Sequence, residues 1–99
     1  MNEFLLRGML EESDYPYLAA YEEEWIDAHG DTKSFDEMGK IHLQNCYRML
    51  KKQKRAIERG FFLKGIAYEE SQYDEIVSMT TALYNKKVKE LVEYLKITD

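Results

Sequence analysis

Residues 35–59 constrain the fold more than any other part of this sequence, because they form a helical pattern with two chemically different faces. At about 100° per residue, apolar side chains collect on one side of such a helix and cations on the opposite side. The apolar side holds Leu43, Cys46, Tyr47, Leu50, Gln53 and Ile57, with His42 and Met49 at its edge. The basic side holds Arg48, Lys51, Lys52, Arg55 and Arg59. Such a helix buries its apolar side against another element, so we predict a mainly α fold.

The neighbouring residues indicate where this helix begins and what it packs against. Ser34 to Glu37 reads Ser-Phe-Asp-Glu, a capping-box pattern that predicts a helix start, and Gly60 offers the left-handed residue that often ends a helix. A narrower apolar stripe predicts a second long helix over residues 70–97. Its members are Tyr73, Ile76, Val77, Thr80, Tyr84, Val88, Leu91 and Leu95. We predict that residues 35–59 and 70–97 form a long antiparallel helical hairpin.

One or two shorter helices are expected before this hairpin. The spacing of Leu5, Leu6, Met9 and Leu10 predicts a helix over residues 2–12. Residues 16–29 also have apolar side chains at helical spacing, and Gly30 would close that helix. The alternative is a small β-hairpin at residues 25–35 that turns at Gly30. Helix is favoured because the three glutamates at 22–24 suit a strand poorly.

Length and composition favour one domain over residues 1–99, since no linker or repeat divides the chain. The single cysteine, Cys46, cannot form an internal disulfide, and no apolar run approaches the roughly 18–20 residues of a membrane span. The first residues also lack the apolar stretch of a signal peptide. We therefore expect a cytoplasmic protein without membrane contact.

Charge is distributed unevenly along the chain. Residues 1–38 carry 11 acidic and 2 basic side chains, residues 39–68 carry 1 and 8, and residues 69–99 carry 7 and 4. This pattern has two explanations: the basic face is neutralised by residues 1–38, or it is presented to a partner.

A short motif gives a resemblance for residues 25–60. Its residues are Trp25, Gly30, Met38, His42, Leu43, Asn45 and Leu50. An aromatic residue, a glycine turn and a methionine that lead into a His-Leu-x-Asn-x-x-x-x-Leu helix resemble small proteins of phages and prophages. The resemblance implies an origin in a phage or another bacterial mobile element, and it implies no established reaction. The glycine turn of those proteins is often strand-like, which supports the hairpin alternative at 25–35.

Few residue groups point to catalysis or to metal binding. His42 and Cys46 lie four residues apart, a spacing at which two side chains can share a metal ion. A structural zinc site needs four ligands, however, and the only other histidine is His29. Residues 22–24 point in different directions on a helix and do not converge. We expect no enzymatic activity, no cofactor and no metal.

The remaining hypotheses are binding functions. The leading one is a non-enzymatic, phage- or prophage-derived module that docks on a host or phage protein through its basic face, with a homodimer as a further possibility. The alternative is a small nucleic-acid-binding regulator that uses Arg48, Lys51, Lys52, Arg55 and Arg59 to follow phosphates.

Overall fold

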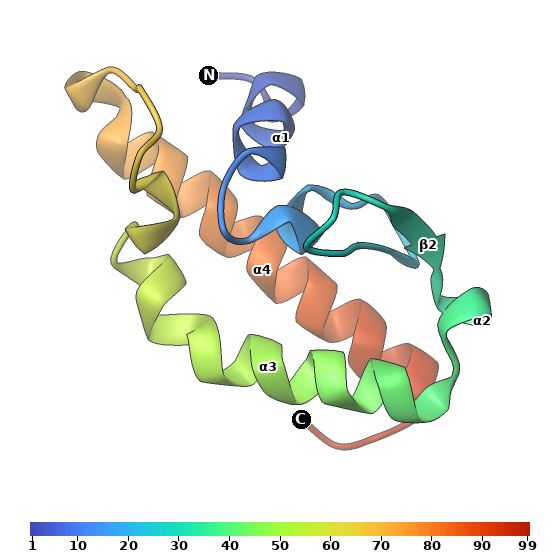
Figure 1. Ribbon diagram of the computed structural model, residues 1–99. Helices are drawn as coiled ribbons and strands as arrows, with labels where there is room; N and C mark the ends of the chain where they lie inside the picture. Colours follow the sequence, from blue (N-terminus) through green and yellow to red (C-terminus); the bar gives the residue numbers. More distant parts are fainter.

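The computed structural model describes residues 1–99 and confirms a mainly helical fold (Figure 1). The α-helices are α1 (Glu3–Glu11), α2 (Phe35–Met38), α3 (Lys40–Glu58) and α4 (Tyr73–Leu95). Short 3₁₀ turns are η1 (Pro16–Ala19), η2 (Phe61–Leu63) and η3 (Glu70–Gln72). The strands β1 (Glu24–Ile26) and β2 (Thr32–Ser34) form a two-stranded antiparallel sheet. None of the helices is both long enough and apolar enough to cross a membrane.

The predicted helical hairpin is confirmed as the pair α3 and α4, which pack against each other along the molecule (Figure 1). Leu43, Leu50 and Ile57 of α3 are fully buried, as are Ile76 and Leu91 of α4. The hydroxyl of Tyr84 donates to the backbone oxygen of Leu50 at 2.9 Å, which adds a buried hydrogen bond between the helices. The opposite side of α4 contacts α1 and η1, so α4 is the central element of the core.

The prediction of one unbroken helix over 35–59 is wrong at Gly39. The capping box is confirmed, because the backbone N–H of Ser34 donates to Oε1 of Glu37 at 3.0 Å. The helix that begins there is the single turn α2, and Gly39, with φ 81° and ψ 153°, separates it from α3. This region of backbone space is open essentially to glycine alone. The bend lets Phe35 enter the core, where its ring packs against Tyr94 with ring centres 5.4 Å apart.

The favoured helix over 16–29 is also wrong, and the hairpin alternative is confirmed. Trp25 pairs with Lys33 across the two strands, and Gly30 lies in the turn between them. The acidic residues do not oppose this, since only Glu24 belongs to a strand. The carboxylate of Asp27 stabilises the turn by accepting backbone N–H bonds from His29 at 2.9 Å and Asp31 at 3.0 Å. This turn chemistry outweighs the helical spacing of the apolar residues.

Two buried cations hold the irregular segment between η1 and β1. The guanidinium of Arg7 donates to the carbonyls of Ala19 and Ala20 at 2.8 and 2.9 Å. The ammonium of Lys87 donates to the carbonyls of Tyr21 and Glu24 at 2.8 and 2.9 Å. Carbonyls buried outside regular structure need such donors. Lys87 therefore fastens this segment onto α4, and Arg7 fastens it onto α1.

Candidate functional site

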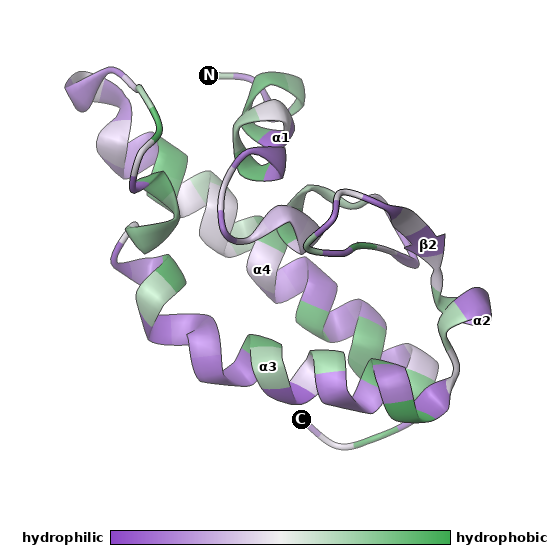
Figure 2. Ribbon diagram, viewed as in Figure 1, coloured by the Kyte–Doolittle hydropathy of each residue, from purple (hydrophilic) through white to green (hydrophobic).

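The basic face of α3, defined as Arg48, Lys51, Lys52, Arg55 and Arg59, is exposed at all five positions. Figure 2 shows hydrophilic residues along much of α3, with apolar residues interspersed. The prediction that apolar and basic residues separate on this helix is confirmed for these residues.

The acidic residues 1–38 do not neutralise the basic face. No ion pair joins the two groups, and the one ion pair of this face runs from Lys51 to Asp99 at 3.0 Å. Arg48 donates to the side-chain oxygen of its helix neighbour Asn45 at 3.1 Å. Acidic side chains instead gather around another surface hollow, which Glu22, Glu23, Glu90 and Glu93 line. Arg48, Lys52, Arg55 and Arg59 are thus left without a carboxylate partner inside the fold.

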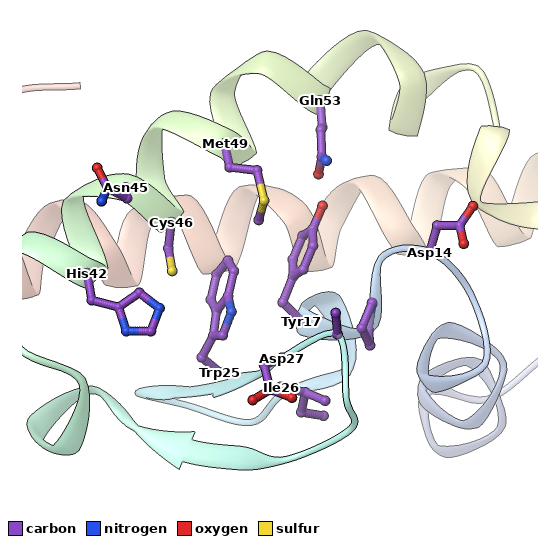
Figure 3. A pocket seen from close by; sticks show the side chains of 12 residues that line it. Asp14, Tyr17, Trp25, Ile26, Asp27, His42, Asn45, Cys46, Met49 and Gln53 are labelled. Carbon is purple, nitrogen blue, oxygen red and sulfur yellow. The ribbon is translucent and has the colours of Figure 1, made fainter.

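A cavity of about 340 Å³ lies between the β-hairpin and α3, and we call it the hairpin pocket (Figure 3). Residues from η1, β1 and the turn after β1 form one wall, and α3 forms the other. The lining residues are Asp14, Pro16, Tyr17, Trp25, Ile26, Asp27, Ala28, His42, Asn45, Cys46, Met49 and Gln53.

The pocket has an aromatic wall and two polar atoms without partners. The rings of Tyr17 and Trp25 stack with centres 4.7 Å apart and planes 5° from parallel. The hydroxyl of Tyr17 and Oε1 of Gln53 are both buried and lack a hydrogen-bond partner. Burial raises the pKa of Tyr17, so its hydroxyl stays protonated and is available as a donor. The wall of the pocket therefore contains one donor and one acceptor that no other group of the protein satisfies.

His42 and Cys46 both line the hairpin pocket, but their chemistry differs from that of a metal or nucleophile pair. Cys46 is buried, and burial raises the pKa of its thiol to about 11. A thiol with this pKa is almost entirely protonated at neutral pH and is a poor nucleophile. His42 is exposed at the rim, and no group of three or more histidine, cysteine or carboxylate side chains is placed to hold a metal ion.

The residues of the phage-like motif divide between the pocket and the core. Trp25, His42 and Asn45 line the pocket, whereas Leu43 and Leu50 are fully buried between the helices. Met38 is half-buried in α2 and packs against the core. Comparison of the chain with protein-family models, curated proteins and solved structures found no match. The resemblance to phage and prophage proteins therefore stays a prediction.

Sequence reasoning missed the pocket because its walls are distant in sequence. Tyr17 lies within residues 16–29, for which the sequence favours a helix, and the sequence predicts no role for Asp27. Gln53 offered a signal, since an amide within an otherwise apolar helix face needs a polar neighbour when it is buried. Only the folded structure shows that Tyr17 lies opposite Gln53.

Proposed function

We propose that this chain is a non-enzymatic protein-binding module that docks its basic face on an acidic surface of a host or phage protein. The observation that supports it best is that four of the five exposed cations of the basic face have no carboxylate partner in the fold. Solvated cations on one rigid helix can meet an acidic partner with little reorganisation, which favours both association rate and specificity.

Apolar residues beside the cations favour a protein as the partner. The side chain of Ile41, at the start of α3, is 76% exposed, and that of Met49 is 37% exposed. Methionine and arginine are enriched in protein interfaces. The net charge of -5 opposes the long-range attraction that nucleic acid binders use. The protonated thiol of Cys46 is a poor nucleophile, which agrees with a binding role for this chain. The proposed phage origin rests on the motif in residues 25–60.

The test compares two charge-reversal variants that change net charge equally. Arg48→Glu with Arg55→Glu alters the basic face, and Lys33→Glu with Lys64→Glu alters exposed lysines elsewhere. We expect wild type and the Lys33/Lys64 control to retain a bacterial or phage protein, whereas the basic-face variant loses it. The retained protein is then purified and titrated against all three by calorimetry. Equal affinity for the basic-face variant and the control would contradict the proposal.

A nucleic-acid function is the second candidate, since the cations recur at i, i+3, i+4, i+7 and i+11 on an exposed face. Single- and double-stranded oligonucleotides are titrated by fluorescence anisotropy at low and physiological salt. Binding that persists at physiological salt in the wild type and disappears in the Arg48/Arg55 variant would favour this function over protein docking. If the basic face is the contact surface, Arg48→Glu with Arg55→Glu should weaken the affinity for the oligonucleotide about ten-fold or more.

A further inference from the structure

We propose that the hairpin pocket binds a small uncharged ring that carries a hydrogen-bond donor beside an acceptor, the edge shared by nucleobases and ring carboxamides. The inference does not depend on the basic face, since it uses the side of α3 that faces the β-hairpin, and Met49 is the one residue that both proposals use.

The first argument is the pair of unsatisfied polar atoms. The side chain of Tyr17 is only 5% exposed, yet its hydroxyl has no acceptor, and Oε1 of Gln53 has no donor. Buried polar groups nearly always have a partner in the protein, in water or in a ligand. Figure 3 shows these two side chains pointing toward one another from opposite walls. A ligand edge that accepts from Tyr17 and donates to Gln53 would satisfy both atoms at once.

The second argument is the shape of the cavity. Its volume of about 340 Å³ lies near the lower end of the range for ligand pockets, which suits one or two rings. Trp25, stacked on Tyr17, gives it a flat aromatic wall. The sulfur atoms of Cys46 and Met49 line the facing wall, and polarisable sulfur packs well against ring edges and faces (Figure 3).

The third argument is charge. No lysine or arginine lines the pocket, whereas Asp14 and Asp27 do. The backbone N–H groups of Asp31 and His29 lower the pKa of Asp27, so this carboxylate stays anionic at neutral pH. It is already engaged by those N–H groups, which leaves neutral Tyr17 and Gln53 to meet the ligand. The charge of the pocket therefore opposes anionic ligands, and the uncharged edge is inferred from the neutral Tyr17 hydroxyl and Gln53 amide.

The test uses four ligands with the same ring and different substituents: benzamide, benzoate, benzylamine and toluene. Uracil and adenine are added to distinguish a nucleobase from a carboxamide as the source of the edge. Titrations are followed by calorimetry and by the backbone amide signals of β1 and α3. We expect benzamide or a nucleobase to bind at millimolar concentration or tighter, and the other three benzene derivatives to bind more weakly. Stronger binding of uracil or adenine than of benzamide assigns a nucleobase, and the reverse order assigns a carboxamide.

Two variants test the contacts. Tyr17→Phe removes only the hydroxyl, and Gln53→Met removes the amide at similar length, so each should weaken binding about ten-fold. Tyr21→Phe and Gln72→Met are matched controls outside the pocket and should bind like wild type. Tyr17→Phe should also leave thermal stability unchanged or raise it, because it removes an unpaired buried hydroxyl.

Three results would overturn the inference. One is that neither the amide nor the nucleobases bind. Another is that benzoate, benzylamine or toluene binds as well as they do. The third is that Tyr17→Phe and Gln53→Met bind as tightly as wild type. None of these results bears on the basic face.

Discussion

Lys87 shows how a single side chain can determine the path of an irregular segment. Its side chain is 3% exposed, and its ammonium also forms an ion pair with Glu90 at 2.9 Å. Burial lowers the pKa of Lys87, while the hydrogen bond and charge of Glu90 oppose that shift. The sequence pattern gave no reason to bury this residue, because the carbonyls that it binds belong to a loop more than sixty positions away.

We predict that Lys87→Met lowers the free energy of unfolding by about 3 kcal/mol, since it removes the buried cation that pairs with Glu90 and donates to the carbonyls of Tyr21 and Glu24. Urea denaturation measures the change. The exposed neighbour Lys86 supplies the control, and Lys86→Met should alter stability by less than about 0.5 kcal/mol. Similar stability for the two variants would contradict the structural role of Lys87.

Asp27 gives a prediction for pH dependence. Backbone N–H bonds, first from Asp31, hold its pKa below the ordinary value in the folded state. A lowered folded-state pKa means that the turn gains stability above the unfolded-state pKa and loses it as the pH falls through the folded-state pKa. The protection factors of the amides in residues 24–34, measured by NMR and corrected for the intrinsic pH dependence of exchange, should therefore fall at acidic pH. In Asp27→Asn this fall should be smaller, and an identical pH profile of the protection factors would contradict the assignment.

The thiol of Cys46 should react slowly with iodoacetamide at neutral pH, because it is buried and its pKa is raised to about 11. Mass spectrometry of the modified protein measures the rate. Addition of denaturant should raise the rate to that of an exposed cysteine, and fast labelling of the folded chain would show that the thiol is accessible.

At the scale of elements, long amphipathic patterns were predictable and glycine-dependent bends were not. The pattern of α4 predicts its helix within a few residues, since twenty-three consecutive helical positions repeat the signal. At Gly39 the same pattern continues through a residue whose φ is positive, so periodicity alone joins α2 to α3. The sequence favours a helix over the β-hairpin because the glutamates at 22–24 suit a strand poorly. In the structure Glu22 and Glu23 lie just before β1 and are exposed, so strand propensity does not apply to them.

We predict that Gly39→Ala costs about 1–3 kcal/mol of stability through backbone strain alone, because an added Cβ would meet no atom within 4 Å. Gly8→Ala is the matched control, since its Cβ is equally free and its helical position has no positive φ. That variant should gain about 0.5–1 kcal/mol. Thermal denaturation distinguishes the two, and equal effects would contradict the strained geometry of Gly39.

At the scale of the whole molecule, one cluster of 21 buried residues connects the four α-helices with η1, β1 and η2. The sequence predicted the α3–α4 part of this core from its stripes. It could not predict the hairpin pocket, whose walls meet only through tertiary packing of Tyr17 and Trp25 opposite Gln53. The sequence also could not decide whether the acidic residues 1–38 form ion pairs with the basic face, because the number of charges in a segment does not give the distances between them.

A single shared core predicts cooperative unfolding. Fluorescence of Trp25, the only tryptophan, follows the hairpin, and far-ultraviolet circular dichroism follows the helices. The two signals should give one coincident midpoint in urea. A lower midpoint for Trp25 would show that the hairpin and its pocket unfold separately.

The central position of α4 also affects how the chain is made. The ribosome synthesises residues 1–72 first, and in that state the inner sides of α1, η1 and α3 lack the helix that covers them. The fold cannot close until residues 73–95 have emerged, so the nascent chain exposes apolar surface through most of its synthesis. Chains that stop before α4 are therefore expected to be substrates for chaperones and proteases.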